Sequence, residues 1–216
     1  MRRLTIFFLC VFLVGNHDIF AQTNYSTYEE YFEKINPTSF KEAEDEFSKA
    51  VVLNPNDIVA YNKMGSRIAL DDGDQAMPFF QKAIEINPHD TDAYNNIGSM
   101  YARSLNGEEK AISYYKKAIE MNPLNPDAYI NLGSILSAKR QYEQAIDYFK
   151  KAISINPDLA YAHYNLGFLY HSLGQEVEAT QSFEKAKVIY ERKGLDRWVR
   201  MTETVLFSVN NKEIKN

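Results

Sequence analysis

The chain has 216 residues, of which 45% are hydrophobic and 13% aromatic, and this composition is too apolar for an intrinsically disordered protein. Its formal net charge of -5 at pH 7 argues against a nucleic acid as the main partner, because such a partner calls for a basic surface. The sequence contains no glycine-rich phosphate loop, no zinc-ligand spacing and no nucleophile elbow. We therefore expect a folded, non-catalytic protein that uses neither a cofactor nor a metal ion.

The segment from Met1 to Ala21 has the pattern of a secretory signal peptide. Arg2 and Arg3 precede an apolar run from Leu4 to Gly15, and Ala21 offers a small residue for cleavage. As a helix this run spans about 18 Å, which is short of the roughly 30 Å core of a bilayer. We expect export to the periplasm or beyond, with loss of Cys10, the only cysteine. If the segment is not cleaved, the protein is tethered to the membrane.

Two signatures recur along the chain in the same register. Each repeated glycine follows an aromatic or histidine residue by four positions. Each repeated Asn-Pro pair begins eleven positions before such a glycine. In both series the successive steps are 33, 35 and 34: Gly65, Gly98, Gly133 and Gly167, with Asn54, Asn87, Asn122 and Asn156. A period of this length indicates stacked helical repeats.

Each unit has the pattern of two amphipathic helices. In the second unit, Tyr94, Ile97, Gly98 and Tyr101 have the offsets of one helical stripe. The following helix carries an alanine, an aromatic residue and a second alanine at offsets of four and seven, and this pattern occurs in every unit. Small residues let neighbouring helices approach closely, so we expect the glycine and the alanines to lie where helices meet.

The Asn-Pro pairs predict where the second helix of each unit ends. Proline cannot continue a helix, and asparagine tolerates the left-handed conformation that often closes one, so we expect that conformation at these asparagines. Asp57, Asp92 and Asp127 follow at the start of the next helix, where an acidic side chain complements the helix dipole.

These residues resemble the tetratricopeptide repeat, most clearly in the third unit with Tyr129, Gly133, Phe149 and Pro157. The resemblance implies an all-α, right-handed superhelical solenoid of helix-turn-helix repeats. The expected organisation is a signal peptide (1–21), a degenerate N-terminal repeat (22–57), four repeats (58–90, 91–125, 126–159 and 160–193) and a C-terminal capping helix and tail (194–216). His163 departs from the family pattern because it replaces an aromatic residue, and we expect a packed imidazole there.

In the family, the first helix of each repeat lines a concave groove, and this implies where a protein or extended peptide would bind. Polar side chains lie on the stripe expected to face that groove, and an exposed aromatic cluster is expected in the fourth repeat. The candidate binding residues are Lys63, Asn96, Ser99, Arg103, Asn131, Ser134, Tyr161, Tyr164, Asn165 and Phe168. Alternatively, the asparagines only form hydrogen bonds with neighbouring helices.

The function that these patterns favour is a protein–protein interaction scaffold. The alternative is a non-catalytic regulatory subunit, or a membrane-tethered adaptor, of an envelope enzyme or assembly complex. His163 and His171 lie on one helix, about 12 Å apart along its axis, and are too distant to share a metal ion. The sequence names neither the partner nor the oligomeric state.

Overall fold

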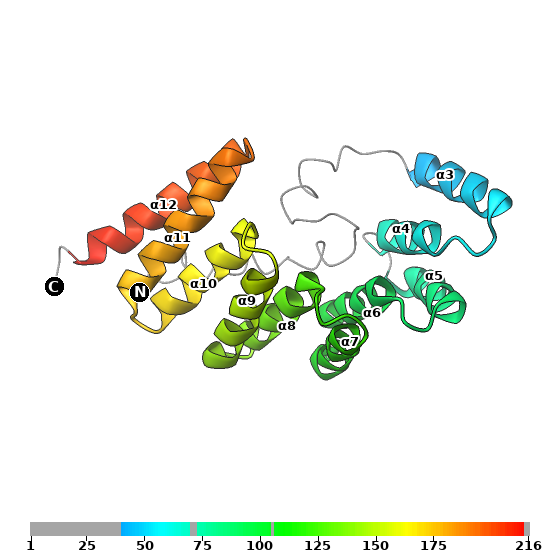
Figure 1. The fold of residues 1–216 in the computed structure, drawn as a ribbon, viewed down its shortest axis with the longest axis horizontal. Coiled ribbons are helices and arrows are strands. Elements are labelled where there is room, and N and C mark those ends of the chain that lie inside the picture. Colours follow the sequence, from blue (N-terminus) through cyan, green and yellow to red (C-terminus); the bar gives the residue numbers. More distant parts are fainter. Residues whose placement is uncertain (1–39, 70–72, 105, 214–216) are drawn as a thin grey trace. The chain divides into compact units, whose positions relative to one another are not determined.

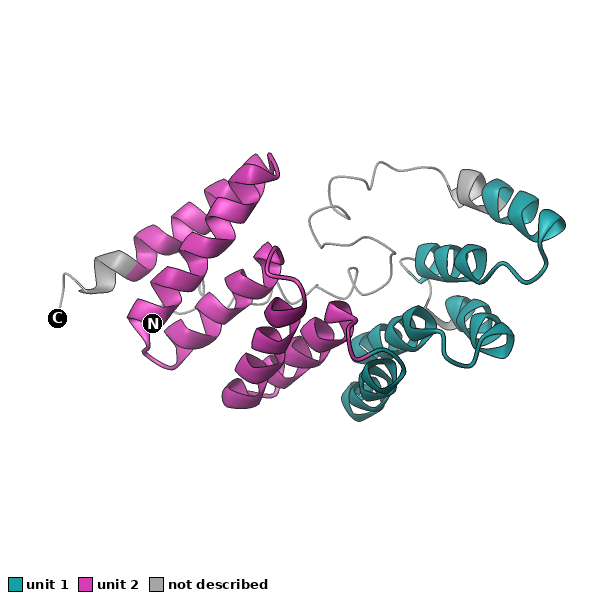
Figure 2. Cartoon of the chain, viewed as in Figure 1, with its two compact units in different colours: residues 1–26, 30–122 teal, residues 27–29, 123–216 magenta. Residues whose placement is uncertain are grey.

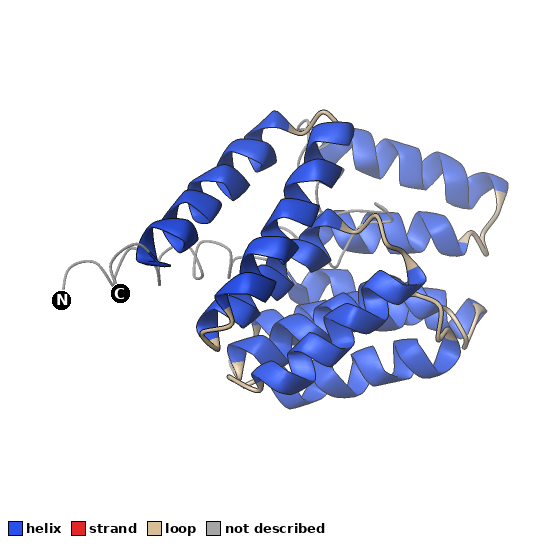
Figure 3. Ribbon diagram, turned by 60° about the vertical axis from the view of Figure 1, so that its left-hand side comes forward, coloured by secondary structure: helices blue, strands red, loops and turns tan. Residues whose placement is uncertain are grey.

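The computed structural model describes residues 40–69, 73–104 and 106–213. All regular secondary structure in this part of the chain is helical (Figures 1 and 3). The helices are α3 (Phe40–Leu53), α4 (Ile58–Ile68), α5 (Gly73–Ile86), α6 (Thr91–Arg103), α7 (Glu108–Met121), α8 (Pro126–Ala138), α9 (Tyr142–Ile155), α10 (Ala160–Ser172), α11 (Glu176–Arg192) and α12 (Asp196–Glu213). The expected all-α class of helical repeats is confirmed. The predicted signal peptide lies outside the described residues.

Two compact units divide the chain (Figure 2). The first contains α3 to α7 and ends at Asn122, and the second begins at Pro123 and contains α8 to α12. Within the first unit, α4 pairs with α5 and α6 with α7; within the second, α8 pairs with α9 and α10 with α11. Each pair is one helix-turn-helix repeat, and α3 resembles the second helix of a further repeat.

A glycine–aromatic contact joins the two helices of every repeat. A Cβ atom added at Gly98 would lie 2.7 Å from the ring of Tyr115, so only glycine lets the ring come this close. The same contact joins Gly65 to Phe80, Gly133 to Phe149 and Gly167 to Phe183. The alanines that flank these rings on the second helices are 0% exposed. The prediction that small residues lie where helices meet is confirmed, and the ring on the glycine comes from the same repeat.

The Asn-Pro corners differ from the predicted conformation. Asn122 and Asn156, which end α7 and α9, are extended, with φ near -140° and -134°. The left-handed prediction is wrong here because the residue before a proline is sterically confined to extended conformations. The side chain of Asn156 instead accepts a hydrogen bond from the N–H of Asp158 at 3.0 Å, and Asn54 and Asn87 make the equivalent bond. Asparagine therefore closes the corner through its side chain.

Acidic or amide side chains cap three of the first helices. Asp57 accepts a hydrogen bond from the N–H of Ala60 at the start of α4, as the sequence predicted. In α6 the cap is Asp90 instead of Asp92, which lies in the first turn, and α8 is capped by Asn125. These caps satisfy backbone donors that the first turn of a helix leaves unpaired.

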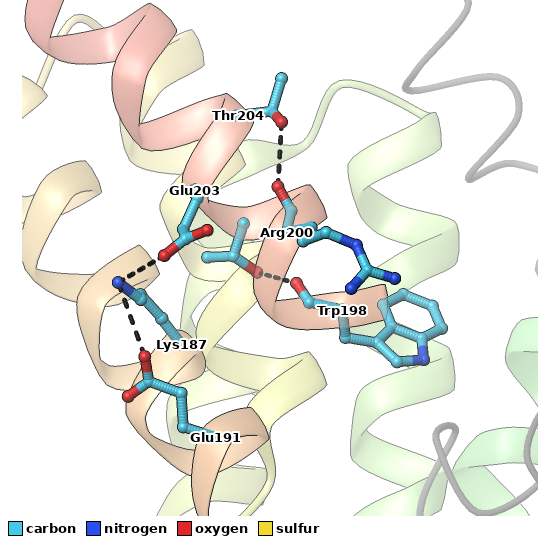
Figure 4. Close-up of polar contacts among 7 residues, drawn as sticks. Lys187, Glu191, Trp198, Arg200, Glu203 and Thr204 are labelled. Carbon is cyan, nitrogen blue, oxygen red and sulfur yellow. Dashed lines mark hydrogen bonds and ion pairs between the residues drawn. The ribbon is translucent and has the colours of Figure 1, made fainter. Parts of the chain in front are cut away.

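The C-terminal helix α12 packs against α11 within the second unit. The indole of Trp198 stacks on Tyr190 with ring centroids 5.7 Å apart, and Thr202 and Val209 are fully buried. Figure 4 shows Lys187 of α11 between Glu191 and Glu203, with its ammonium 2.8 Å from the Glu203 carboxylate. None of the described helices combines the length and apolarity needed to cross a bilayer.

Candidate functional site

The structure separates the ten candidate residues into three groups by exposure. Lys63 is exposed, and five others are half-buried: Arg103, Asn131, Ser134, Asn165 and Phe168. The remaining four are buried: Asn96, Ser99, Tyr161 and Tyr164. A partner can reach the first two groups directly, whereas the four buried side chains have almost no surface to offer.

We predicted an exposed aromatic cluster on α10, formed by Tyr161, Tyr164 and Phe168. This prediction is wrong for the two tyrosines. Tyr161 is 7% exposed and Tyr164 only 2%. Tyr164 packs edge-on against Phe168 and Phe183, with ring centroids 4.9 and 5.5 Å apart. Gly167 lets the Phe183 ring approach α10 closely, and the rings of Tyr164 and Phe168 pack against the Phe183 ring. Only Phe168 keeps a partly accessible surface.

In the second unit, polar candidates form hydrogen bonds with their own helices. The side-chain N–H of Asn165 donates to the carbonyl of Tyr161 at 3.1 Å, and the hydroxyl of Ser134 donates to the carbonyl of Ile130 at 2.9 Å. Both acceptor carbonyls lie one turn earlier on the same helix as the donor. These bonds do not join neighbouring helices.

In the first unit, polar side chains join consecutive repeats. A guanidinium nitrogen of Arg103 on α6 donates to the carbonyl of Ala69, at the C-terminal end of α4, at 2.9 Å. The side-chain N–H of Asn62 on α4 donates to the carboxylate of Asp90, the cap of α6, at 2.6 Å. Arg103 was predicted to contact a partner, and the structure also gives it this link between repeats.

Asn62 is a residue that the sequence reasoning missed. It is 3% exposed, and its carbonyl oxygen Oδ1 is buried without a hydrogen-bond partner. An unsatisfied buried acceptor costs about 1–3 kcal/mol. Exchanging the amide oxygen and nitrogen gives no relief, because Oδ1 would then face the Asp90 carboxylate, which has no proton to donate. The sequence signal was Asn62 itself, since it follows Tyr61 as Asn95 follows Tyr94.

The side chain of Ser99 forms hydrogen bonds in the protein interior. Its hydroxyl lies 3.0 Å from the carbonyl of Asn95 and 3.1 Å from the hydroxyl of Tyr115, and the residue is 1% exposed. The serine therefore satisfies the phenol of the ring that packs on Gly98.

His163 performs the task of the aromatic residue that it replaces. Its Nε2 lies 3.1 Å from the carbonyl of Pro157, and in the preceding repeat the hydroxyl of Tyr129 donates to the carbonyl of Pro123 at 3.2 Å. Since a carbonyl only accepts, Nε2 carries the proton. Burial lowers the pKa of His163 below its ordinary value of 6.5, and the bond to Pro157 only partly opposes this effect. The predicted packed imidazole is confirmed, with a specific hydrogen bond added.

Other histidine and lysine side chains of the described residues form local contacts. His171 forms a hydrogen bond with Glu176 across the turn between α10 and α11, with Nδ1 2.6 Å from the carboxylate. Among the described residues, no three His, Cys, Asp or Glu side chains are grouped to hold a metal ion. Lys110 and Lys117 each place an ammonium over a tyrosine ring at 5.0–5.9 Å from its centroid. The arrangement can recognise a partner through hydrogen bonds and apolar contacts.

Comparison with known families and structures supports the same fold. Models described as "TPR repeat" and "Tetratricopeptide repeat" match residues 133–174 and 114–147, and a further tetratricopeptide model matches 67–90, 91–123 and 160–191. Together these matches run from residue 67 to 191, more than half of the chain.

Solved structures share this architecture. MamA is 25% identical, with 79% of this chain and 98% of MamA covered at a TM-score of 0.58. PilW, described as a widely conserved type IV pilus biogenesis factor, is 20% identical, with 82% and 89% covered at a TM-score of 0.60. TTC0263, a thermophilic TPR protein of Thermus thermophilus, is 21% identical, with 78% and 90% covered at a TM-score of 0.65. No curated protein matches the sequence.

Proposed function

We propose, since the chain belongs to the tetratricopeptide repeat family, that it is a non-catalytic scaffold that binds a protein or extended peptide along its first helices. Tetratricopeptide repeats are protein-interaction modules, and this supports the general role. The finer proposal concerns which side chains make the contact.

One observation supports this finer proposal: packing buries most of each repeat, whereas polar side chains on the first helices of the second unit keep a partly exposed surface. The glycine–aromatic contacts and the flanking alanines are buried throughout. Asn131, Ser134 and Asn165 are half-buried instead, and the bonds of Ser134 and Asn165 described above stay within one helix. An amide offers both a donor and an acceptor, which suits the backbone of an extended peptide.

The test uses the full chain and two matched triple variants. In the first, Asn131, Ser134 and Asn165 are all replaced by alanine; in the second, three exposed residues of second helices are replaced: Gln144, Lys151 and Gln181. Both are compared with the wild type in capturing partners from an envelope fraction, and thermal unfolding checks that both fold. We expect the first variant to lose a partner that the control retains. Equal capture by both variants, with both folded, would contradict the proposal.

We also propose that the protein is exported, on the strength of its N-terminal sequence pattern. N-terminal sequencing of the native protein tests this. A chain that begins at Gln22 supports cleavage and export. A chain that begins at Met1 supports the membrane-tethered adaptor.

A further inference from the structure

One contact in the first unit joins two side chains that are both ligands for soft metal ions. The Nδ1 atom of His89 lies 3.0 Å from the sulfur atom Sδ of Met121. His89 belongs to the corner between α5 and α6, and Met121 is the last residue of α7. His89 is exposed and Met121 is half-buried, so a small ion from the solvent can reach both atoms.

Corner packing does not require this combination of side chains. The pair consists of the second residue after one repeated asparagine and the residue before the next repeated asparagine. The equivalent pairs of the neighbouring repeats are Asn56 with Ile86 and Leu124 with Ile155. Neither pair contains an imidazole or a thioether. A hydrogen bond explains the observed pair poorly, because a thioether is a weak acceptor and an exposed imidazole has water as a better partner.

The two donor atoms decide which metal ion suits the pair. Thioether sulfur is a soft ligand that favours Cu(I), and imidazole also suits copper, whereas Mg²⁺ and Ca²⁺ prefer oxygen ligands. Zn²⁺ sites are built from thiolate, imidazole and carboxylate groups, and among the described residues no three such side chains are grouped. Cu(I) and the chemically similar Ag(I) accept low coordination numbers, so a pair of side chains is sufficient for either ion.

The geometry needs only a small adjustment to admit an ion. Bonds of the length that zinc makes to nitrogen and sulfur, about 2.0–2.3 Å, would place the two ligand atoms roughly 3.5–4.5 Å apart. Their present separation is 3.0 Å, and rotation of an exposed histidine and a flexible methionine side chain supplies the extra distance. The imidazole binds a metal only in its neutral form, so binding should weaken in acid.

We propose that His89 and Met121 form a binding site for the soft monovalent ion Cu(I), which joins the α5–α6 corner to the end of α7. Such a site revises the expectation that the protein uses no metal ion, which rested on zinc-ligand spacings and left methionine sulfur out. The site uses none of the side chains proposed to contact a partner, so the scaffold function does not depend on it. An ion held between two elements of the folded chain stabilises the first unit.

The test uses Ag(I) as a redox-stable probe in chloride-free buffer. The parent protein is the untagged full chain with Cys10→Ser, because a thiol would bind the same ion. His89→Asn and Met121→Ile introduce the residues that the preceding repeat carries at these positions. His171→Asn is the matched control, because the Nδ1 atom of this histidine faces a carboxylate instead of a sulfur. Affinities come from calorimetry, and NMR follows the Met121 methyl resonance.

The parent protein and His171→Asn should bind one Ag(I) with equal affinity. His89→Asn and Met121→Ile should each bind it at least about tenfold more weakly, because each variant lacks one of the two ligands. The Met121 methyl resonance of the parent protein should shift when Ag(I) is added. Saturation with Ag(I) should raise the midpoint of thermal unfolding of the parent by several degrees, and Zn²⁺ should cause neither change.

Three results would overturn the site. One is equal affinity of the parent, His89→Asn and Met121→Ile for Ag(I), which would place any bound silver elsewhere. Another is a Met121 methyl resonance that does not move; this measurement is made on the parent and does not depend on the folding of any variant. The third is Zn²⁺ binding as tight as that of Ag(I), which would contradict the selection of a soft ion. Unfolding curves without metal check that each variant is folded.

Discussion

Replacing Gly167 by alanine should destabilise the protein although alanine is the better helix former. The added Cβ would lie 2.7 Å from two ring carbons of Phe183. Phe183 is fully buried, and its ring contacts Tyr164 and Phe168 at centroid distances of 5.5 and 5.1 Å, so it has no free space into which to move. Overpacking of this kind costs about 1–3 kcal/mol. Alanine in a helix interior recovers roughly 0.5–1 kcal/mol, so the midpoints of the two ranges give a net loss of about 1 kcal/mol, and the largest loss is about 2.5 kcal/mol.

Gly133→Ala is the matched control within the same unit. There the added Cβ would lie 3.2 Å from the Phe149 ring, so a shift of a few tenths of an ångström relieves the contact. The gain in helix propensity then offsets most of the strain, and we expect stability within about 0.5 kcal/mol of the wild type. The assay is urea unfolding followed by far-UV circular dichroism, with thermal unfolding as a second measure. Each kcal/mol should lower the midpoint of thermal unfolding by about 2–4 °C for a chain of this size.

Two results would refute this reasoning. One is a Gly167→Ala variant as stable as the wild type, and the other is a larger loss at Gly133 than at Gly167. A double-mutant cycle with Phe183→Leu isolates the cause. In that background the ring is gone, so the alanine at position 167 should cost much less. An unchanged cost would place the strain elsewhere.

Four further substitutions each change a single side chain. His163→Tyr should be as stable as the wild type at pH 7 and should lose less stability than the wild type as the pH falls below about 6.5. The reason is that His163 has a lowered pKa in the folded wild type, so the unfolded chain takes up a proton at a higher pH than the folded chain. Urea unfolding midpoints from pH 5 to 8 test this prediction. Arg103→Met should lower the free energy of unfolding by about 1.5–3 kcal/mol, because it leaves the carbonyl of Ala69 without its charged donor, and hydrogen exchange in α4 should speed up. Lys187→Met should change the unfolding midpoint little, and the change should depend on salt, because its ion pairs are exposed to solvent. Trp198→Ala should lower the free energy of unfolding by about 3–5 kcal/mol, because the indole is buried. Unfolding midpoints measured at low and high salt distinguish the electrostatic effect of the first variant from the packing effect of the second.

The repeat architecture could be predicted from local patterns because its determinants are short-range in sequence. The glycine and the aromatic ring that packs on it belong to the same repeat, as Gly98 and Tyr115 do, and each helix shows its stripe within a single turn or two. Corner geometry was harder to predict. Asparagine before proline can close a helix through its backbone or its side chain, and the steric restriction by the proline favours the side chain.

The exposure of the candidate site residues was the least predictable part. Tyr164 and Ser99 lie on the predicted first helices. The helical period does not predict which aromatic ring of a neighbouring helix contacts each of them. Tyr164 packs against the ring of Phe183, and the hydroxyl of Ser99 forms a hydrogen bond with the hydroxyl of Tyr115. These contacts depend on side-chain directions across a helix pair, which a single helical stripe does not contain.

The sequence by itself determined the helices and their pairing into repeats, because both depend on periodic residues a few turns apart. Only the tertiary structure decided how each polar group is satisfied. It paired His163 with the carbonyl of Pro157, joined Arg103 to Ala69, and left one oxygen of Asn62 buried without a donor. Whether a buried polar atom finds a partner depends on atomic distances between helices, and those distances are set when the helices pack.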